Sequence, residues 1–82
     1  LATPDLVSLF AWSEDEFEQR LQGSPIRRIG HERWLRNIAI ALGNAETSDS
    51  VISALNARAD HSSAIVREHV SWALTQHGLA EH

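Results

Sequence analysis

The chain has 82 residues, 43% of them hydrophobic, which suits one small domain with a modest core and is too short for most complete enzymes. It has no cysteine, which excludes a disulfide framework and thiolate ligation of a metal. No apolar run approaches the ~20 residues that span a bilayer, so we expect no membrane partner. The first residues contain neither an initiator Met nor a signal-peptide pattern, so we expect a piece of a longer, cytoplasmic protein.

Two helices are expected in residues 1–23. The first begins near Thr3–Asp5, where Pro suits the first turn and an acid suits the positive end of the helix dipole. Ser13 and Glu16 have the spacing of a capping box, which predicts a second helix from about Glu14 to Gln22. We expect these two helices to form a hairpin that caps one end of the domain.

The stretch Arg33–Asn44 organises the rest of the chain. Its apolar residues recur at three- and four-residue spacing, so they lie on one stripe of a helix that runs from about His31 to Leu42. We expect Gly43 to end this helix in the left-handed conformation, which glycine adopts without side-chain cost. Before the helix, Ser24-Pro25 can cap a further turn, so residues 26–29 form a short helix or a structured loop. The apolar stripe comprises Trp34, Leu35, Ile38, Ala39, Ala41 and Leu42.

Two further helices are expected after this one. Ser48 or Asp49 caps the first of them, and the turn at residues 60–63 carries capping chemistry for the second, which runs from about Ala64 to Gln76. No segment shows sustained alternation of apolar and polar residues, so we expect no sheet. The residues expected to face inward are Val51, Ile52, Leu55 and Ala59 in the first helix, and Ile65, Val66, Val70, Ala73 and Leu74 in the second.

The chain contains an internal repeat with a period of 31 or 32 residues. The repeated pattern is a hydrophobic residue followed by Arg, and then Ala-Leu. It occurs as Leu35-Arg36 with Ala41-Leu42, and as Val66-Arg67 with Ala73-Leu74. This pattern resembles HEAT-type helical repeats, in which paired helices stack into a solenoid. The predicted fold is therefore all-α, a HEAT-like helical-repeat fragment of about four to five helices. We expect the repeats in residues 24–82 and the capping hairpin in residues 1–23, together as one domain.

Basic residues concentrate in the middle of an otherwise acidic chain. The formal net charge is −4, yet residues 24–45 carry four Arg residues against Glu32 alone. All seven basic residues are Arg, whose planar guanidinium suits bidentate contacts to phosphate or carboxylate. The alternative is that these Arg residues pair with acids such as Glu32 or Glu68 on a solvated surface. The candidate nucleic-acid-binding residues are Arg27, Arg28, Arg33, Arg36 and Asn37.

The other chemistry-bearing residues indicate no further site. His61, His69 and His77 recur at eight-residue intervals, but eight helical residues span ~12 Å, which is too far for a shared metal ion. No nucleophile with an oriented partner emerges, so we expect no catalytic, cofactor-binding or metal-ligating residue. Aromatic residues among Arg residues can stack unpaired bases, but we interpret all three Trp residues as core residues, because a small domain needs their buried area.

Several short sequence motifs occur together in this chain. They are Gly23–Arg28, Arg36-Asn37 with Ala41–Asn44, and His61–Ala64 with Val66–His69 and Trp72–Leu74. Their combination resembles the C-terminal region of the epoxyqueuosine reductase family, and the resemblance covers nearly the whole chain. Members of that family reduce the epoxide of epoxyqueuosine in the tRNA anticodon loop, the last step of queuosine biosynthesis, and use a cobalamin and two 4Fe-4S clusters.

The resemblance implies a helical module that helps to hold the tRNA anticodon stem-loop beside the catalytic iron-sulfur domain of the same chain. It implies no cofactor in these 82 residues, because cluster ligation needs Cys thiolates and the family's catalytic and cobalamin-binding residues precede this region. Two functions stay open. The first is tRNA docking, through the Arg cluster, for an oxidoreductase of tRNA processing. The second is a HEAT-type protein–protein interaction module, whose Arg residues meet an acidic partner and which has no RNA role.

Overall fold

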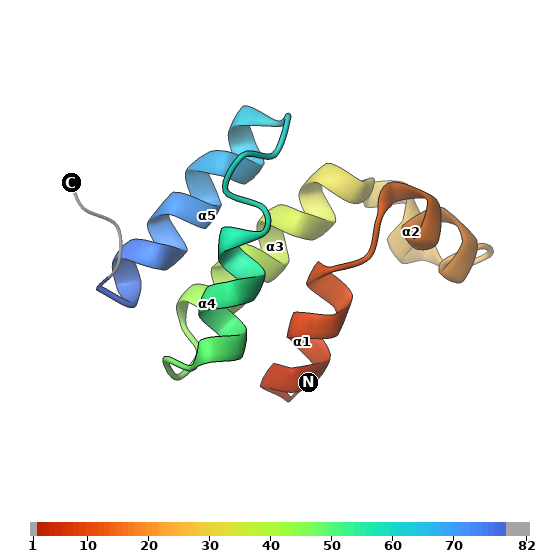
Figure 1. Cartoon of the computed structure of the whole chain (residues 1–82). Coiled ribbons are helices and arrows are strands. Elements are labelled where there is room, and N and C mark those ends of the chain that lie inside the picture. Colours follow the sequence, from red (N-terminus) through yellow and green to blue (C-terminus); the bar gives the residue numbers. More distant parts are fainter. Residues whose placement is uncertain (1, 79–82) are drawn as a thin grey trace.

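The computed structural model describes residues 2–78, and these residues form helices and no strand (Figure 1). The all-helical fold class is therefore confirmed for this part of the chain. Residues 26–29, which the sequence left open between helix and loop, belong to a 3-10 helix, η1 (Pro25–Ile29). The five α-helices are α1 (Thr3–Phe10), α2 (Glu14–Arg20), α3 (His31–Gly43), α4 (Asp49–Asn56) and α5 (Ala64–Gln76).

Serine side chains begin three of these helices. Ser13 and Glu16 form the expected capping box, with the Glu16 N–H donating to Ser13 Oγ at 3.1 Å and the Ser13 N–H donating to Glu16 Oε1 at 3.3 Å. Ser48 accepts from the backbone N–H of Val51 at the start of α4, and Ser63 caps α5 in the same way. Each cap satisfies a backbone donor that has no partner within its helix.

The helices form two layers around α3. Figure 1 shows α1 and α4 side by side in one layer, and α3 and α5 side by side in the other. Helix α3 contacts every other element, which confirms its predicted central position. Helix α2 and η1 pack mainly against α3. The HEAT-like organisation of residues 24–82 and the capping role of residues 1–23 stay predictions.

Burial follows the internal repeat at a period of 31 residues. Leu35 and Val66 are both fully buried, and so are Leu42 and Ala73. The two Ala-Leu pairs are 32 residues apart, so the buried residue is the Leu of the first pair and the Ala of the second. Leu55 is also fully buried, so the predicted burial of the central leucines is confirmed. The buried core comprises Phe10, Leu35, Ile38, Ala39, Leu42, Val51, Leu55, Val66, Val70 and Ala73.

Two residues of α5 that were expected to face inward are exposed. Ile65 is 44% exposed and Trp72 is 39% exposed, so the prediction of core packing is wrong for both. Each of them directly precedes a buried residue of α5, Val66 and Ala73 respectively. One helical position is a rotation of ~100°, which places both side chains at the border of the buried stripe.

The predicted left-handed end of α3 at Gly43 is also wrong. Gly43 is a buried helical residue, and its backbone angle φ is not positive, in contrast to Gly30. A β-carbon at Gly43 would overlap the indole ring of Trp72 and would lie 3.1 Å from Cα of Ala73. The absence of a side chain therefore lets α5 approach α3 closely. Asn44 ends the helix and donates its side-chain amide to the carbonyl oxygen of Ile40 at 3.1 Å.

Candidate functional site: an arginine surface on the central helix

The outer face of α3 presents three of the five candidate residues. Arg33 and Asn37 are exposed there, one helical turn apart, and Arg36 lies half-buried beside them. Nε and Nη2 of Arg36 both donate to Oδ1 of Asn37, at 3.2 and 3.0 Å. This pairing uses the amide oxygen of Asn37 and leaves its NH2 group as a donor. Because Asn37 is neutral, the guanidinium of Arg36 keeps its full charge.

The other two candidates lie on η1, which packs against α3. Arg28 is exposed, whereas Nε of Arg27 forms an ion pair with Oε1 of Glu18 at 2.6 Å. Half of each side chain in this pair remains accessible, so solvent screens the interaction. The structure therefore places the candidate residues on adjoining elements, with part of the charge of Arg27 already matched.

The alternative pairing of α3 arginines with nearby acids finds no support within residues 2–78. Neither Arg33 nor Arg36 forms an ion pair there. The carboxylate of Glu32 accepts a hydrogen bond from Ser63 Oγ at 2.5 Å instead. Glu68 lies on α5 and lines a shallow pocket with Ile40. Two guanidinium groups on one helix face are thus available for an external anion.

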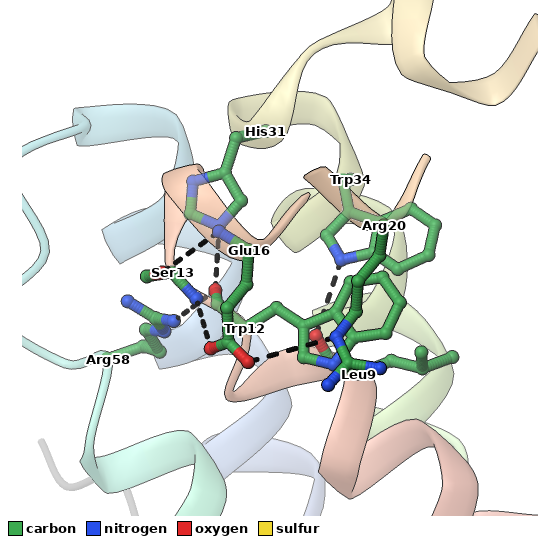
Figure 2. A network of polar contacts seen from close by, with 8 residues as sticks. All are labelled: Leu9, Trp12, Ser13, Glu16, Arg20, His31, Trp34 and Arg58. Carbon is green, nitrogen blue, oxygen red and sulfur yellow. Dashed lines mark hydrogen bonds and ion pairs between the residues drawn. The ribbon is translucent and has the colours of Figure 1, made fainter. Parts of the chain in front are cut away.

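Arg58 has a structural role that the sequence did not reveal (Figure 2). Nη2 of Arg58 donates to the carbonyl oxygens of Phe10 at 3.2 Å and Trp12 at 2.8 Å, and Nε donates to Phe10 at 3.3 Å. Nε2 of His31 donates to the same Trp12 oxygen at 2.9 Å. Burial lowers the pKa of Arg58 from its ordinary value. These bonds tie the α1–α2 connection to α3 and to the residues that follow α4.

Two of the three tryptophans are covered by neighbouring side chains. The rings of Trp12 and Trp34 stack with centroids 5.6 Å apart and planes 13° apart, and the guanidinium carbon of Arg20 lies 5.3 Å from the Trp12 centroid (Figure 2). The rings of Phe17 and Trp34 form a T-shaped pair, and Nε1 of Trp34 donates to the carbonyl oxygen of Leu9. Trp12 and Trp34 thus use part of their ring surface to contact each other and their neighbours.

The three histidines His61, His69 and His77 have separate hydrogen-bond partners. Nδ1 of His69 donates to the carbonyl oxygen of Ile65 at 2.8 Å. Nε2 of His77 donates to the carbonyl oxygen of Leu42 at 2.8 Å. His61 lies elsewhere, at the start of the turn before α5. Within the described chain no three His, Asp or Glu side chains converge to hold a metal ion.

The surroundings of His61 lower its pKa. Burial lowers the pKa of His61 below its ordinary value of 6.5, neighbouring groups that carry positive charge act in the same direction, and the carboxylate of Glu32 opposes them. The backbone N–H of Ser63 donates to Nδ1 of His61 at 3.0 Å, which requires that nitrogen to be unprotonated. The groups that lower this pKa are Arg58, His31 and Arg67.

We therefore expect acid to destabilise the fold through His61. Because the folded-state pKa is depressed, the unfolded chain binds more protons, and stability is lost as the pH falls below about 6.5 toward the folded-state value. Thermal unfolding followed by circular dichroism should show Tm falling over this window. His61→Asn, whose amide oxygen still accepts from Ser63, should show a smaller fall. An equal fall in both proteins would assign the effect to other groups.

No helix among residues 2–78 is long and apolar enough to cross a membrane. Comparison with curated proteins relates the chain to one enzyme. It is 65% identical over 74 residues to the epoxyqueuosine reductase of Xanthomonas campestris pv. campestris, a match covering 90% of this chain and 21% of that protein. The protein of the same name from Pseudomonas aeruginosa is 55% identical over 78 residues, which is 95% of this chain and 22% of that protein.

The epoxyqueuosine reductase of Escherichia coli is 51% identical over 77 residues, which is 93% of this chain and 20% of that protein. The chain thus spans about a fifth of the length of the curated relatives it matches. No protein-family model and no solved structure matches it. The resemblance that the sequence motifs indicated is therefore confirmed, and it concerns one part of these enzymes.

Proposed function

We propose that the chain is the helical, tRNA-docking part of an epoxyqueuosine reductase, with the outer face of α3 as the docking surface. The name of the similar proteins supports the reductase assignment. The single observation that supports docking is the position of Arg33 and Arg36, which lie on one helix face without an acidic partner among residues 2–78. Guanidinium groups in this setting suit backbone phosphates.

In this proposal the reduction itself takes place elsewhere in a longer protein. The family resemblance implies iron-sulfur clusters and a cobalamin, but this chain contains no Cys and so does not fit a cluster. Its proposed contribution is to hold the anticodon stem-loop against the catalytic iron-sulfur part of the same polypeptide. Arg36 would contact phosphate while Asn37 contributes its amide NH2 group.

The positions of the acidic residues also support α3 as the docking surface. Helix α2 carries four acids, Glu14, Asp15, Glu16 and Glu18, whereas Glu32 is the one acid of α3. RNA is repelled by the first surface and attracted to the second, so the charge distribution orients it toward α3. The net negative charge of the chain is therefore compatible with a local cationic docking face.

A protein–protein interaction module is the second candidate. Ile40 and Trp72 are exposed and line one pocket between α3 and α5, and exposed apolar side chains that lie together are typical of protein interfaces. An acidic partner would then meet Arg33 and Arg36. Binding of RNA and of an acidic protein to the same variants separates this candidate from tRNA docking.

The test replaces Arg33 and Arg36 by Gln in the intact reductase that the proposal places around this chain. The double variant should bind an anticodon stem-loop more weakly, and its salt dependence should fall by about one unit in slope per lost phosphate contact. The chemical step on bound substrate should change little. Lys replacements should restore affinity only partly if the contacts are bidentate.

Arg20→Gln is the matched control, since it removes one exposed positive charge from α2. It should leave the salt slope unchanged. Circular dichroism shows whether each variant is folded. A folded Arg33→Gln/Arg36→Gln protein with unchanged affinity and slope would end the docking proposal.

A further inference from the structure

Trp72 is the tryptophan whose ring is open to solvent. It is 39% exposed and lines a shallow pocket of ≈ 410 Å³ together with Ile40, Glu68 and His69. The pocket lies between α3 and α5. Ile40 and Trp72 supply its apolar lining, and the two polar residues that line it, Glu68 and His69, belong to α5. An exposed indole in an apolar hollow differs from Trp12 and Trp34, whose rings cover each other.

The indole of Trp72 packs against the backbone of α3 at Gly43. The ring of Trp72 lies so close to the backbone of Gly43 that a β-carbon there would overlap it, and Ala73 is buried against the same glycine. An indole that packs against a helix backbone and keeps part of its surface exposed can accept a planar partner with little reorganisation. Stacking on such a ring is how proteins bind unpaired bases.

The polar side chains of the pocket are hydrogen-bond acceptors. Because Nδ1 of His69 donates to the carbonyl oxygen of Ile65, the neutral ring has its proton on Nδ1 and an acceptor lone pair on Nε2. The ionised carboxylate of Glu68 is also an acceptor. Guanine, adenine and cytosine each carry an exocyclic amino group with two N–H donors, so they match this edge better than uracil, which has no amino group and offers its N3–H donor.

The pocket continues the arginine surface along α3. Ile40 lies one helical turn after Arg36, about 6 Å along the axis at the usual rise. Arg33 lies in the preceding turn, on the same outer face. A nucleotide joins an anionic phosphate to a flat apolar base, and this surface offers a guanidinium beside a half-exposed indole. Charge on one side and an apolar hollow on the other thus favour RNA over an apolar protein segment as the occupant.

We infer that the Trp72 pocket binds one unpaired, amino-bearing nucleobase of the docked RNA by stacking on the indole. This inference rests on the proposed function, since Arg33 and Arg36 supply the phosphate contacts that bring the loop to the pocket. Glu68 and His69 accept hydrogen bonds from the base edge. The paired stem makes no contact with the pocket, because its bases are already stacked.

The test pairs a protein variant with an RNA series, both in the intact reductase. The RNA is an anticodon stem-loop in which each loop nucleotide in turn is made abasic. At one loop position the abasic change should weaken binding to the natural protein about five- to a hundredfold, the range for stacking on one aromatic ring. Trp72→Leu should show the same loss with the complete loop and no further loss with the abasic one. Trp72→Phe should keep part of the affinity.

Ile65→Ala is the control variant, because Ile65 is exposed on the same helix but does not line the pocket. It should bind RNA normally. Equal losses for Ile65→Ala and Trp72→Leu at every loop position would indicate a protein-covered apolar face and overturn the inference. If Trp72→Leu does not fold, the Trp72→Phe protein and the abasic series give the same comparison.

The two proposals fail separately. Trp72 carries no charge, so Trp72→Leu should leave the salt slope unchanged, whereas Arg33→Gln/Arg36→Gln should lower it. A lowered slope for the Arg variant, with no abasic position that depends on Trp72, would remove the base pocket and keep the docking surface. Normal binding by both variants would remove the proposed function as well.

Discussion

Leu42→Ala is expected to lower the free energy of unfolding by about 2–5 kcal/mol, the usual cost of deleting a fully buried leucine side chain. Leu42 has no exposed surface and lies on the face of α3 that meets the core, together with Leu35 and Ala39. Because small domains have total stabilities of roughly 5–15 kcal/mol, this loss takes a large part of the margin. Urea unfolding followed by circular dichroism measures it.

Ile40→Ala is the matched control for this prediction. Ile40 lies on the same helix but is 37% exposed, so its truncation should cost well under half as much. A Leu42→Ala protein that unfolds at the same denaturant concentration as the Ile40→Ala protein would contradict the position of the core given above.

Gly43→Leu is expected to destabilise the fold by roughly 3 kcal/mol, the upper part of the range for overpacking. The new side chain must displace the Trp72 ring and also meets the Cα of Ala73, which belongs to the α5 backbone. Gly43→Ala should cost less, because Trp72 is partly exposed and can turn aside, and because Ala favours a helix over Gly by about 1 kcal/mol.

A double-mutant cycle with Trp72→Ala identifies the cause. With the indole removed, Gly43→Leu should cost less than it does in the natural chain, and part of the cost should remain because the Ala73 backbone is still close. Denaturant unfolding of the four proteins gives the coupling. An identical cost in both backgrounds would mean that the indole does not constrain Gly43.

Local signals in the sequence predicted the elements and most of the core. Ser13 and Glu16 are three residues apart, so their reciprocal capping depends on nothing outside one helical turn, and it is confirmed. Leu42 and Leu55 were recognised as buried because each belongs to a regular apolar stripe. Such features depend on spacing along the chain, which a sequence displays directly.

Features that depend on contacts between helices were missed or misread. Gly43 was interpreted as a helix end, because its real constraint is a ring on α5 that local spacing does not show. Ile65 and Trp72 were assigned to the core, since one position of error in helical phase rotates a side chain by ~100°. Because Trp72 was assigned to the core, the pocket around it was not predicted from the sequence. The packing of α5 against α3 reveals this pocket.

The candidate docking residues were identified from the concentration of Arg in residues 24–45. Within residues 2–78, the structure separates those without an ion pair from the one that has an acidic partner. Arg33 and Arg36 share a face of α3, as their spacing predicts, whereas Arg27 is matched by Glu18. No sequence signal indicated that ion pair, because the two residues lie on separate elements. Whether these residues bind RNA stays a prediction.

The hydrogen bonds of Arg58 have a consequence for how the molecule folds. They join carbonyl groups at Phe10 and Trp12 to a side chain 46 to 48 residues further along the chain. The N-terminal segment therefore reaches its final position only when the residues after α4 are already in place, and the closing of so long a loop is slow relative to helix formation. Unfolding of the first helix should in turn release a half-buried guanidinium from its only acceptors among residues 2–78. Helices α1 and α4 are thus kinetically dependent on each other, and α1 should come apart together with α4 and not before it.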